Sequence, residues 1–261
     1  MFRVRDAGRK DRDKKERCTH RVSRRFSELD WRDTPLGEIT LRRRLEPELL
    51  VDVYEVLLGD EFLMSSLFVT AEVELARRGL AAVTGTGLDV IVGGLGLGYT
   101  ARAVLEDPRV RSLRVIEVLD AVIDWHRGEL LPLSGELIRD QRCQLEPGDF
   151  FAAAAAGFGL SGTGCHAVLV DIDHTPRHVL HPSHAAFYSA EGLGWVVSAL
   201  HPGGVFALWS DDPPDSEFVD LLAEMFDYAD AHVVTFANHY TGAESANTVY
   251  VASVLAMPAA T

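Results

Sequence analysis

The feature of the sequence that most constrains its fold is a short apolar strand that runs straight into a glycine-rich turn. Leu88–Val92 is the predicted strand, Gly93-Gly-Leu-Gly-Leu-Gly98 follows it, and a helical pattern begins at Tyr99. Glycine lets a chain turn sharply and lets a ligand approach the backbone. Strand, glycine turn and helix in this order are typical of open α/β sheets, which bind ligands beside such a turn.

Beyond the turn, apolar segments and helical segments alternate along the chain. The predicted strands are 113–116, 143–145, 167–170 and 204–209, and the predicted helices are 99–105, 121–127 and 215–228. This alternation predicts a doubly wound, mostly parallel sheet. Segments 232–236 and 248–255 are joined by a loop that suits a hairpin, so we expect one antiparallel strand near an edge of the sheet.

The chain before the turn has a different pattern. Segments 26–31, 38–45 and 50–58 show strand-like alternation, and 61–78 shows an apolar stripe that predicts a helix. We therefore expect an α/β protein with a small N-terminal β domain and a Rossmann-like domain. The expected parts are a basic tail over 1–25, a β-rich domain with one helix over 26–80, and the Rossmann-like domain over 81–261.

Charge is distributed unevenly. Residues 1–25 hold 11 of the 25 Lys and Arg and 4 of the 39 Asp and Glu, a net charge of +7, which leaves −21 on the remainder. An acidic body repels phosphate backbones and attracts cations such as amines, so we expect no nucleic-acid partner. The tail is read as a solvated arm rather than an interaction site.

Residue usage excludes several classes of chemistry. The lysines are Lys10, Lys14 and Lys15, all in the tail, which leaves no lysine for a phosphate-binding P-loop or for pyridoxal chemistry. The cysteines are scattered, without a zinc or disulfide pattern, and fit a reducing compartment. No apolar run reaches the roughly 18 residues of a membrane span, and the charged start is no secretory signal. We expect a cytoplasmic protein.

The glycine turn is the first candidate binding site. Its glycines follow the spacing Gly94-x-Gly96-x-Gly98, and Tyr99 stands where a dinucleotide fingerprint requires the third glycine. The turn therefore fits a ligand without a pyrophosphate, such as a nucleoside sulfonium. A purely structural turn is the alternative.

Acidic residues follow the next two predicted strands. Glu117 lies 23 positions after Gly94, where a carboxylate can accept hydrogen bonds from both ribose hydroxyls. Asp149 follows the third strand and could accept from an adenine amine, with Phe150 or Phe151 beside the ring. A solvated strand-end charge is the alternative for Glu117.

Asp171 and Asp173 follow the predicted strand 167–170 and would face the same crevice. They could bind a cationic amine and take its proton, because bare charge at a buried sheet end is costly unless it is paired. Asp211 and Asp212 follow the next strand and would add negative potential to this rim, although a helix N-cap explains them equally well.

Histidines 174, 178, 181 and 184 cluster after this strand and raise the question of a metal. Pro176 and Pro182 interrupt any helix that could present the histidines on one face, and no cysteine accompanies them. We expect no metal. The segment is interpreted as a loop that covers the substrate, with His174 available to titrate near neutral pH.

From about residue 27 to 255 the sequence resembles the spermidine synthases, the polyamine aminopropyltransferases, and especially a divergent bacterial group of this family. A class I methyltransferase-type fold is the broader likeness. The matching segments are Thr34–Ile39, Gly59–Phe62, Val90–Gly98, Glu117, Gly148-Asp149, Asp171-x-Asp173, Phe187-Tyr188 and Pro202–Phe206.

The resemblance implies transfer of an aminopropyl group from decarboxylated S-adenosylmethionine to an amine such as putrescine, without a metal and often in a homodimer. It implies that Glu117 holds the ribose, Asp149 the adenine, and Asp171 with Asp173 the amine. It further implies substrate-binding roles for Glu61 and Tyr188. His174 and Asp211 are two further candidates for binding the substrate.

The sequence departs from the family pattern at three places. Gly96 or Leu97 stands where the family has an aspartate for the amine of the donor, and the second acid comes at Asp173 rather than at His174. Met64 and Ser65 replace an aromatic residue and a glutamine or histidine. All three changes concern amine recognition, so ordinary S-adenosylmethionine and methyl transfer to a small molecule stay an alternative. A non-catalytic nucleoside-binding protein is a third, and nucleic-acid modification through the basic arm is the most distant.

Overall fold

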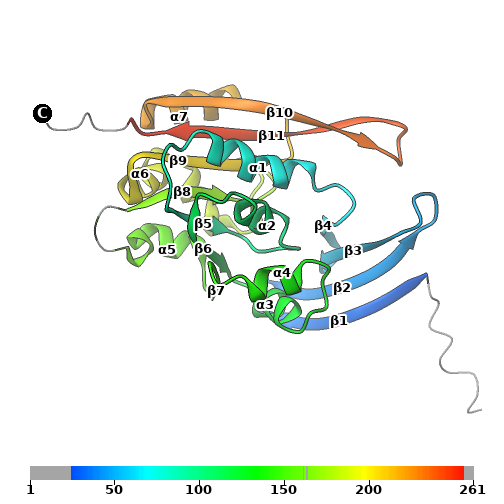
Figure 1. The fold of residues 1–261 in the computed structure, drawn as a ribbon. Coiled ribbons are helices and arrows are strands. Elements are labelled where there is room, and N and C mark those ends of the chain that lie inside the picture. The colour runs from blue at the N-terminus through cyan, green and yellow to red at the C-terminus, as the bar shows by residue number, and fades with distance from the viewer. Residues whose placement is uncertain (1–24, 161, 163, 256–261) are drawn as a thin grey trace, which may run out of the picture. The chain divides into compact units, whose positions relative to one another are not determined.

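The computed structural model describes residues 25–160, 162 and 164–255 and divides into two compact units (Figure 1). The first unit is Met1–Leu63 and the second is Met64–Thr261. The predicted tail over 1–25 lies, except for Arg25, outside the described residues. No helix among the described residues is long and apolar enough to cross a membrane.

A four-stranded sheet in the order β1-β2-β3-β4 forms the N-terminal part of the chain. Its strands are β1 (Phe26–Thr34), β2 (Gly37–Glu46), β3 (Val51–Leu58) and β4 (Glu61–Ser65). The alternation predicts strands in this region, and the structure pairs β1, β2 and β3 antiparallel in sequence order. Ile39 and Leu41 of β2 lie on one face with Val56, the β3 partner of Leu41, and all three side chains are buried.

The predicted helix over 61–78 is wrong in its first part. Glu61–Ser65 forms strand β4, which pairs with β3, and helix α1 begins at Thr70. Gly59 has a φ of +58° and makes the turn between the two strands. Pairing across this turn overrides the helical pattern of the segment, because a neighbouring strand satisfies its backbone groups.

The second unit is built on a seven-stranded sheet in the order β10-β11-β9-β8-β5-β6-β7. Its strands are β5 (Leu88–Gly93), β6 (Val110–Glu117), β7 (Cys143–Pro147), β8 (Cys165–Val170), β9 (Leu200–Ser210), β10 (Tyr228–Asn238) and β11 (Ala243–Ser253). Strands β5 to β9 are parallel, and β11 is antiparallel to both β9 and β10. The single reversed strand next to an edge confirms the prediction from the sequence.

Helices cover both faces of this sheet (Figure 1). They are α1 (Thr70–Ala81), α2 (Tyr99–Leu105), α3 (Asp120–Arg127), α4 (Ser134–Arg139), α5 (Phe150–Ala155), α6 (Ala190–Ala199) and α7 (Ser216–Met225), with short 3₁₀ helices at Gly157–Gly159 and Pro182–Tyr188. The strands read as near-continuous apolar runs, as expected for a sheet that is covered on both faces.

Successive side chains of β8 point to opposite faces of the sheet and therefore pack against different helices. Val168 and Val170 point into an aromatic core with α5, α6 and α7. Leu169 points to the opposite face, where a Cβ on Gly79 of α1 would lie only 2.7 Å from the Leu169 Cδ2 atom. Gly79 therefore lets α1 lie close against β8. A residue after the end of β8 that points to the same side of the sheet as Leu169 also points toward α1.

Candidate active site

The candidate site lies at the carboxyl ends of the parallel strands of the second unit. Strand β5 is central: β6 and β7 extend from it on one side, and β8 and β9 on the other. Chain connections leave β5 and β8 in opposite directions at this point, which creates a crevice beyond the strand ends. The glycine turn follows β5, and Asp171 follows β8. The structure thus brings together two segments that are about 75 residues apart in the sequence.

Gly94 is the tightest point of the turn. Its φ is +89°, and a Cβ built on it would lie 2.1 Å from the backbone oxygen of Asp171. The Asp171 amide also donates to the Gly93 carbonyl at 2.9 Å. Only glycine allows the turn and the end of β8 to approach this closely.

Replacing Gly94 with alanine is expected to lower the free energy of unfolding by about 3 kcal/mol, because a left-handed backbone and a steric overlap are both penalised. Gly85→Ala is the matched control, since Gly85 has the same φ of +89° with nothing within 4 Å of its Cβ position. Urea unfolding measures both. Equal losses in the two variants would show that the close contact at Gly94 has no energetic weight.

His126 contacts the backbone of the glycine turn, a role that the sequence does not reveal. The side chain, on α3, is fully buried, and its Nε2 atom lies 2.9 Å from the Gly96 carbonyl oxygen. Burial lowers the pKa of this imidazole, so the neutral ring donates through Nε2–H. Within the described part of the chain, its Nδ1 atom has no hydrogen-bond partner. One histidine within a predicted amphipathic helix gives no signal of such a contact.

Glu117 holds the turn through its carboxylate. The Leu95 amide donates to Oε2 and the Leu119 amide donates to Oε1, both at 2.9 Å. Burial raises the pKa of Glu117, while these amides oppose the shift. Each carboxylate oxygen can accept a second hydrogen bond. The amides of Gly96 and Val118 also act on this carboxylate, so backbone donors on both sides hold the side chain in place. The ribose role of Glu117 stays a prediction.

Asp149 lies at the N-terminus of α5 and is exposed. Its Oδ1 atom accepts from the amides of Phe151 and Ala152 at 2.9 and 3.3 Å. Among the described residues, its Oδ2 atom accepts no hydrogen bond. Capping the helix and binding an amine can therefore occur together. The adenine role of Asp149 stays a prediction.

The Phe150 ring is buried in the aromatic core rather than exposed at the crevice. It contacts the rings of Phe151, Phe158 and Phe187, and a Cβ on Gly93 would lie 2.6 Å from it. Phe150 thus supports the start of the turn from inside the protein. A direct contact between this ring and an adenine stays a prediction.

The carboxyl group of Asp171 is buried, although the residue as a whole is partly exposed. The residue retains part of its exposed surface, and the Thr100 hydroxyl donates to Oδ2 at 2.7 Å. Burial raises the pKa of Asp171 to about 6, and the Thr100 hydrogen bond opposes the shift. A carboxylate with such a pKa can accept a proton near neutral pH, as a general base must.

Asp173 has a different environment from Asp171. Its side chain is fully buried, and Oδ1 accepts from the Leu180 amide at 2.7 Å and from His184 Nδ1 at 2.9 Å. The Tyr188 hydroxyl donates to Oδ2 at 2.8 Å. These three donors tie the segment after β8 to a single carboxylate. The predicted catalytic role of Asp173 and the substrate role of Tyr188 are not tested by this geometry.

The remaining predicted substrate residues lie in different places. The Asp211 amide donates to the His174 carbonyl at 2.7 Å, and the Asp211 carboxylate accepts from Asn247 at 2.7 Å, so this segment is close to the loop after β8. Glu61 begins β4 in the first unit and is exposed. Their substrate roles stay predictions. Across the described ranges, no group of three or more His, Cys, Asp and Glu side chains is arranged to hold a metal ion.

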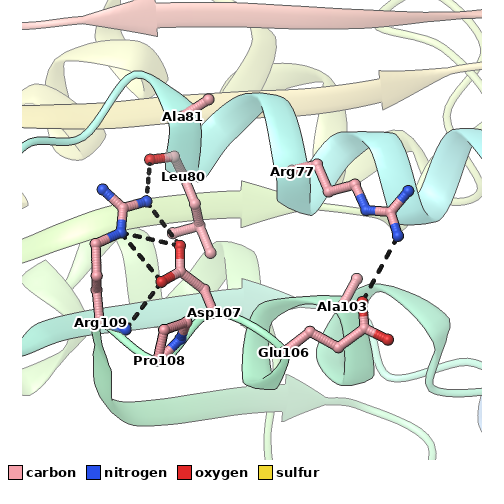
Figure 2. Close-up of a pocket in the computed structure, with 8 residues that line it drawn as sticks. All are labelled: Arg77, Leu80, Ala81, Ala103, Glu106, Asp107, Pro108 and Arg109. Atoms are coloured by element: carbon pink, nitrogen blue, oxygen red, sulfur yellow. Dashed lines mark hydrogen bonds and ion pairs between the residues drawn. The ribbon is translucent and has the colours of Figure 1, made fainter.

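A hollow of 460 Å³ lies away from this crevice, between α1, α2 and the loop that precedes β6 (Figure 2). Because that loop enters β6, the hollow is at the amino end of the strand. Its guanidinium groups already have partners: Arg109 bonds to Asp107 and to the Leu80 carbonyl, and Arg77 lies 3.7 Å from Glu106. Among the described residues that line the hollow, both arginines therefore have an acidic partner.

A small antiparallel sheet followed by a mostly parallel, doubly wound sheet with one reversed strand defines the class of fold, an α/β protein of the Rossmann-like type. The particular fold is spermidine synthase-like. No family model matches the sequence.

Two solved structures carry that conclusion. A spermidine synthase from Thermotoga maritima superposes with a TM-score of 0.66 at 16% identity, over 87% of this chain and 72% of the other. A spermidine synthase in complex with the transition-state analogue AdoDATO gives 0.68 at 17% identity, over 87% and 73%. At this identity the likeness establishes the fold, and the roles of individual residues rest on the site geometry above.

Proposed function

We propose that this chain is a transferase that moves an aminopropyl group from decarboxylated S-adenosylmethionine to a small amine such as putrescine. The observation that carries the proposal is the close approach of the glycine turn after β5, which Glu117 holds, to Asp171 at the end of β8. One of the two similar structures is a spermidine synthase bound to a transition-state analogue, which supports the same class of donor. The proposal also places the reaction in the cytoplasm.

The nucleoside half of the site would be held by two acids whose carboxylates already accept hydrogen bonds from backbone amides. Glu117 is held by backbone amides of the turn and would accept hydrogen bonds from the ribose hydroxyls. Asp149 has its Oδ2 atom available for the adenine amine. Such pre-formed acceptors cost little reorganisation when the ligand binds.

The amine half of the reaction would depend on Asp171. A sulfonium is a good leaving group, so the protein has to hold the amine in line with the carbon and keep it unprotonated. Asp171 accepts the proton of the bound ammonium, and the free amine nitrogen attacks the carbon next to sulfur. A carbon–nitrogen bond forms as the carbon–sulfur bond breaks, and methylthioadenosine leaves as a neutral thioether. Asp173, with three donors on its carboxylate, would act as a positioning residue for the loop.

Methyl transfer from S-adenosylmethionine is the second candidate, and one observation favours it. Gly96 has no side chain, and Leu97 is 5% exposed, so neither can replace the aspartate that grips the donor amine in the family. Without that acid, the carboxylate of ordinary S-adenosylmethionine meets less repulsion. A non-catalytic nucleoside-binding protein is the remaining possibility.

Titration calorimetry with three ligands separates these functions. We expect decarboxylated S-adenosylmethionine to bind at least as tightly as S-adenosylmethionine, because the acidic rim favours the ligand without a carboxylate, and we expect methylthioadenosine to bind as well. A clear preference for S-adenosylmethionine would favour methyl transfer. Nucleoside binding without any product from putrescine would favour the non-catalytic protein, and no binding of any of the three would refute the proposal.

A further inference from the structure

Glu72, on the first turn of α1, faces the end of β8. Residues 72, 75 and 79 share one face of the helix by their spacing, and Gly79 lies against Leu169 of β8. Asp171 comes two residues after Leu169 and continues the same face of the sheet. With Gly79 placed against Leu169, the N-terminal turn of α1 brings Glu72 near Asp171.

Thr100 connects the two acids. Its hydroxyl oxygen lies 2.7 Å from Asp171 Oδ2 and 3.3 Å from the backbone oxygen of Glu72. The three residues come from α1, α2 and the end of β8, which are adjacent in the fold. Within the described part of the chain, no arginine or histidine forms an ion pair with Glu72 or Asp171. Two carboxyl groups thus share a buried environment without a cation.

Burial and the charge of Asp171 raise the pKa of Glu72 to about 8, while burial raises that of Asp171 to about 6. Such a pair loses its protons in two separate steps. Between the two steps the pair holds one proton and one negative charge. Both residues keep some exposed surface.

We propose that Glu72 is a further residue of the amine site, and that its carboxyl group forms with Asp171 a pair that binds a cationic amine and releases its shared proton in doing so. This inference rests on the proposed function, since it concerns the acceptor of the same site. It also supplies an acid for amine recognition in a chain that has lost the family's aspartate at Gly96.

Other titratable groups near α1 have partners elsewhere. The elements packed on α1 are α2, β8, β9, β10 and β11. Several ionisable residues on or next to these elements have partners away from Glu72: Arg102 with Glu106 and Glu136, His166 with the Asp89 amide, His232 with Asp230, Asp211 with Asn247, Tyr250 with the Asp215 amide, and Glu74 with Arg77 and Arg78. The charge that acts on Glu72 is therefore that of Asp171.

The proton balance of the cycle is closed. The free pair has one proton, and binding of an ammonium group releases that proton to solvent, which leaves two carboxylates beside the cation. Asp171 then takes a proton from the ammonium, and the neutral nitrogen attacks the donor carbon. The product nitrogen carries a positive charge, as the sulfur did, so charge is conserved in the transfer.

Calorimetry in two buffers of different ionisation enthalpy tests the proposal at pH 7. Putrescine is titrated into the full chain saturated with methylthioadenosine. We expect the wild type to release close to one proton per putrescine bound, because the pair changes from one proton to none. Glu72→Gln should lose this release and bind putrescine at least about 10-fold more weakly. Glu74→Gln, an acid on the same helix that is paired with arginine, should behave as the wild type.

Two further measurements test the pair in case the Glu72→Gln variant is difficult to interpret. In the ligand-free wild type, infrared spectroscopy should show a protonated carboxyl band at pH 7 that disappears when putrescine binds, and this readout needs no variant. Thermal unfolding of Glu72→Gln should approach or exceed that of the wild type as pH rises, since a raised pKa means that stability present below about 4.5 is lost by pH 8.

The outcomes separate the inference from the proposed function. Failure of methylthioadenosine to bind refutes the proposed function itself. Nucleoside binding followed by putrescine binding without proton release, or with equal release in Glu72→Gln and wild type, overturns the role of Glu72 and leaves the function standing. Absence of the infrared band in the ligand-free protein overturns it as well.

Discussion

Glu117→Gln is expected to lower the affinity for methylthioadenosine by about 100-fold or more. The glutamine side chain has one acceptor oxygen, so its NH₂ group would face either the Leu95 amide or the Leu119 amide, donor against donor. Loss of one charged hydrogen bond to the turn and one to a ribose hydroxyl, at about 1.5 kcal/mol each, gives a loss of this size. Calorimetry with methylthioadenosine measures it.

The control for this variant is Glu224→Gln, an exposed acid on α7, which should bind the nucleoside as the wild type does. Circular dichroism of Glu117→Gln should show an intact fold, because glutamine has nearly the size of glutamate and the pairing of the strands is unchanged. If Glu117→Gln retains wild-type affinity, the ribose does not bind at the end of β6, and the assignment of the crevice fails with it.

Asp171→Asn is expected to reduce kcat for aminopropyl transfer by about 10³-fold, because an amide cannot accept the proton of the ammonium group. In the wild type, the rate should rise with pH through about 6 as Asp171 ionises. The residual rate of Asp171→Asn should lack this step. Steady-state assays of putrescine with decarboxylated S-adenosylmethionine, from pH 5 to 9, give both quantities.

Loss of folding does not explain this expected effect. The pKa of Asp171 is raised in the folded protein, so the stability that it contributes below its ordinary value of 3.8 is lost as pH rises through about 6. The neutral asparagine avoids that loss and should be as stable as the wild type at pH 7. Asp220→Asn, on the exposed side of α7, is the control. A rate for Asp171→Asn within a few-fold of the control would remove Asp171 from the mechanism.

The sequence alone predicted the strands of the second unit and the sheet edge at which the candidate site is placed. Leu88–Val92 and the glycines after it define a strand and a turn by local pattern, and the carboxyl ends of parallel strands must share one edge of a sheet. For that reason Glu117, Asp149 and Asp171 could be assigned to the same edge before any coordinates. The sequence missed α4 and α6, which are short or apolar on several sides and so lack a clear helical period.

Tertiary structure decided what each acid at that edge contacts. Asp171 and Asp173 are equivalent in the sequence, but only Asp173 meets three donors, from Leu180, His184 and Tyr188. Glu72 is an ordinary helix residue until α1 lies against β8, and Phe150 is a candidate ring until it packs on Gly93. In each case the deciding quantity is burial or a hydrogen-bond partner contributed by another segment of the chain. Local sequence fixes dihedral preferences and periodicity, whereas the environment of a side chain exists only after distant segments have packed together.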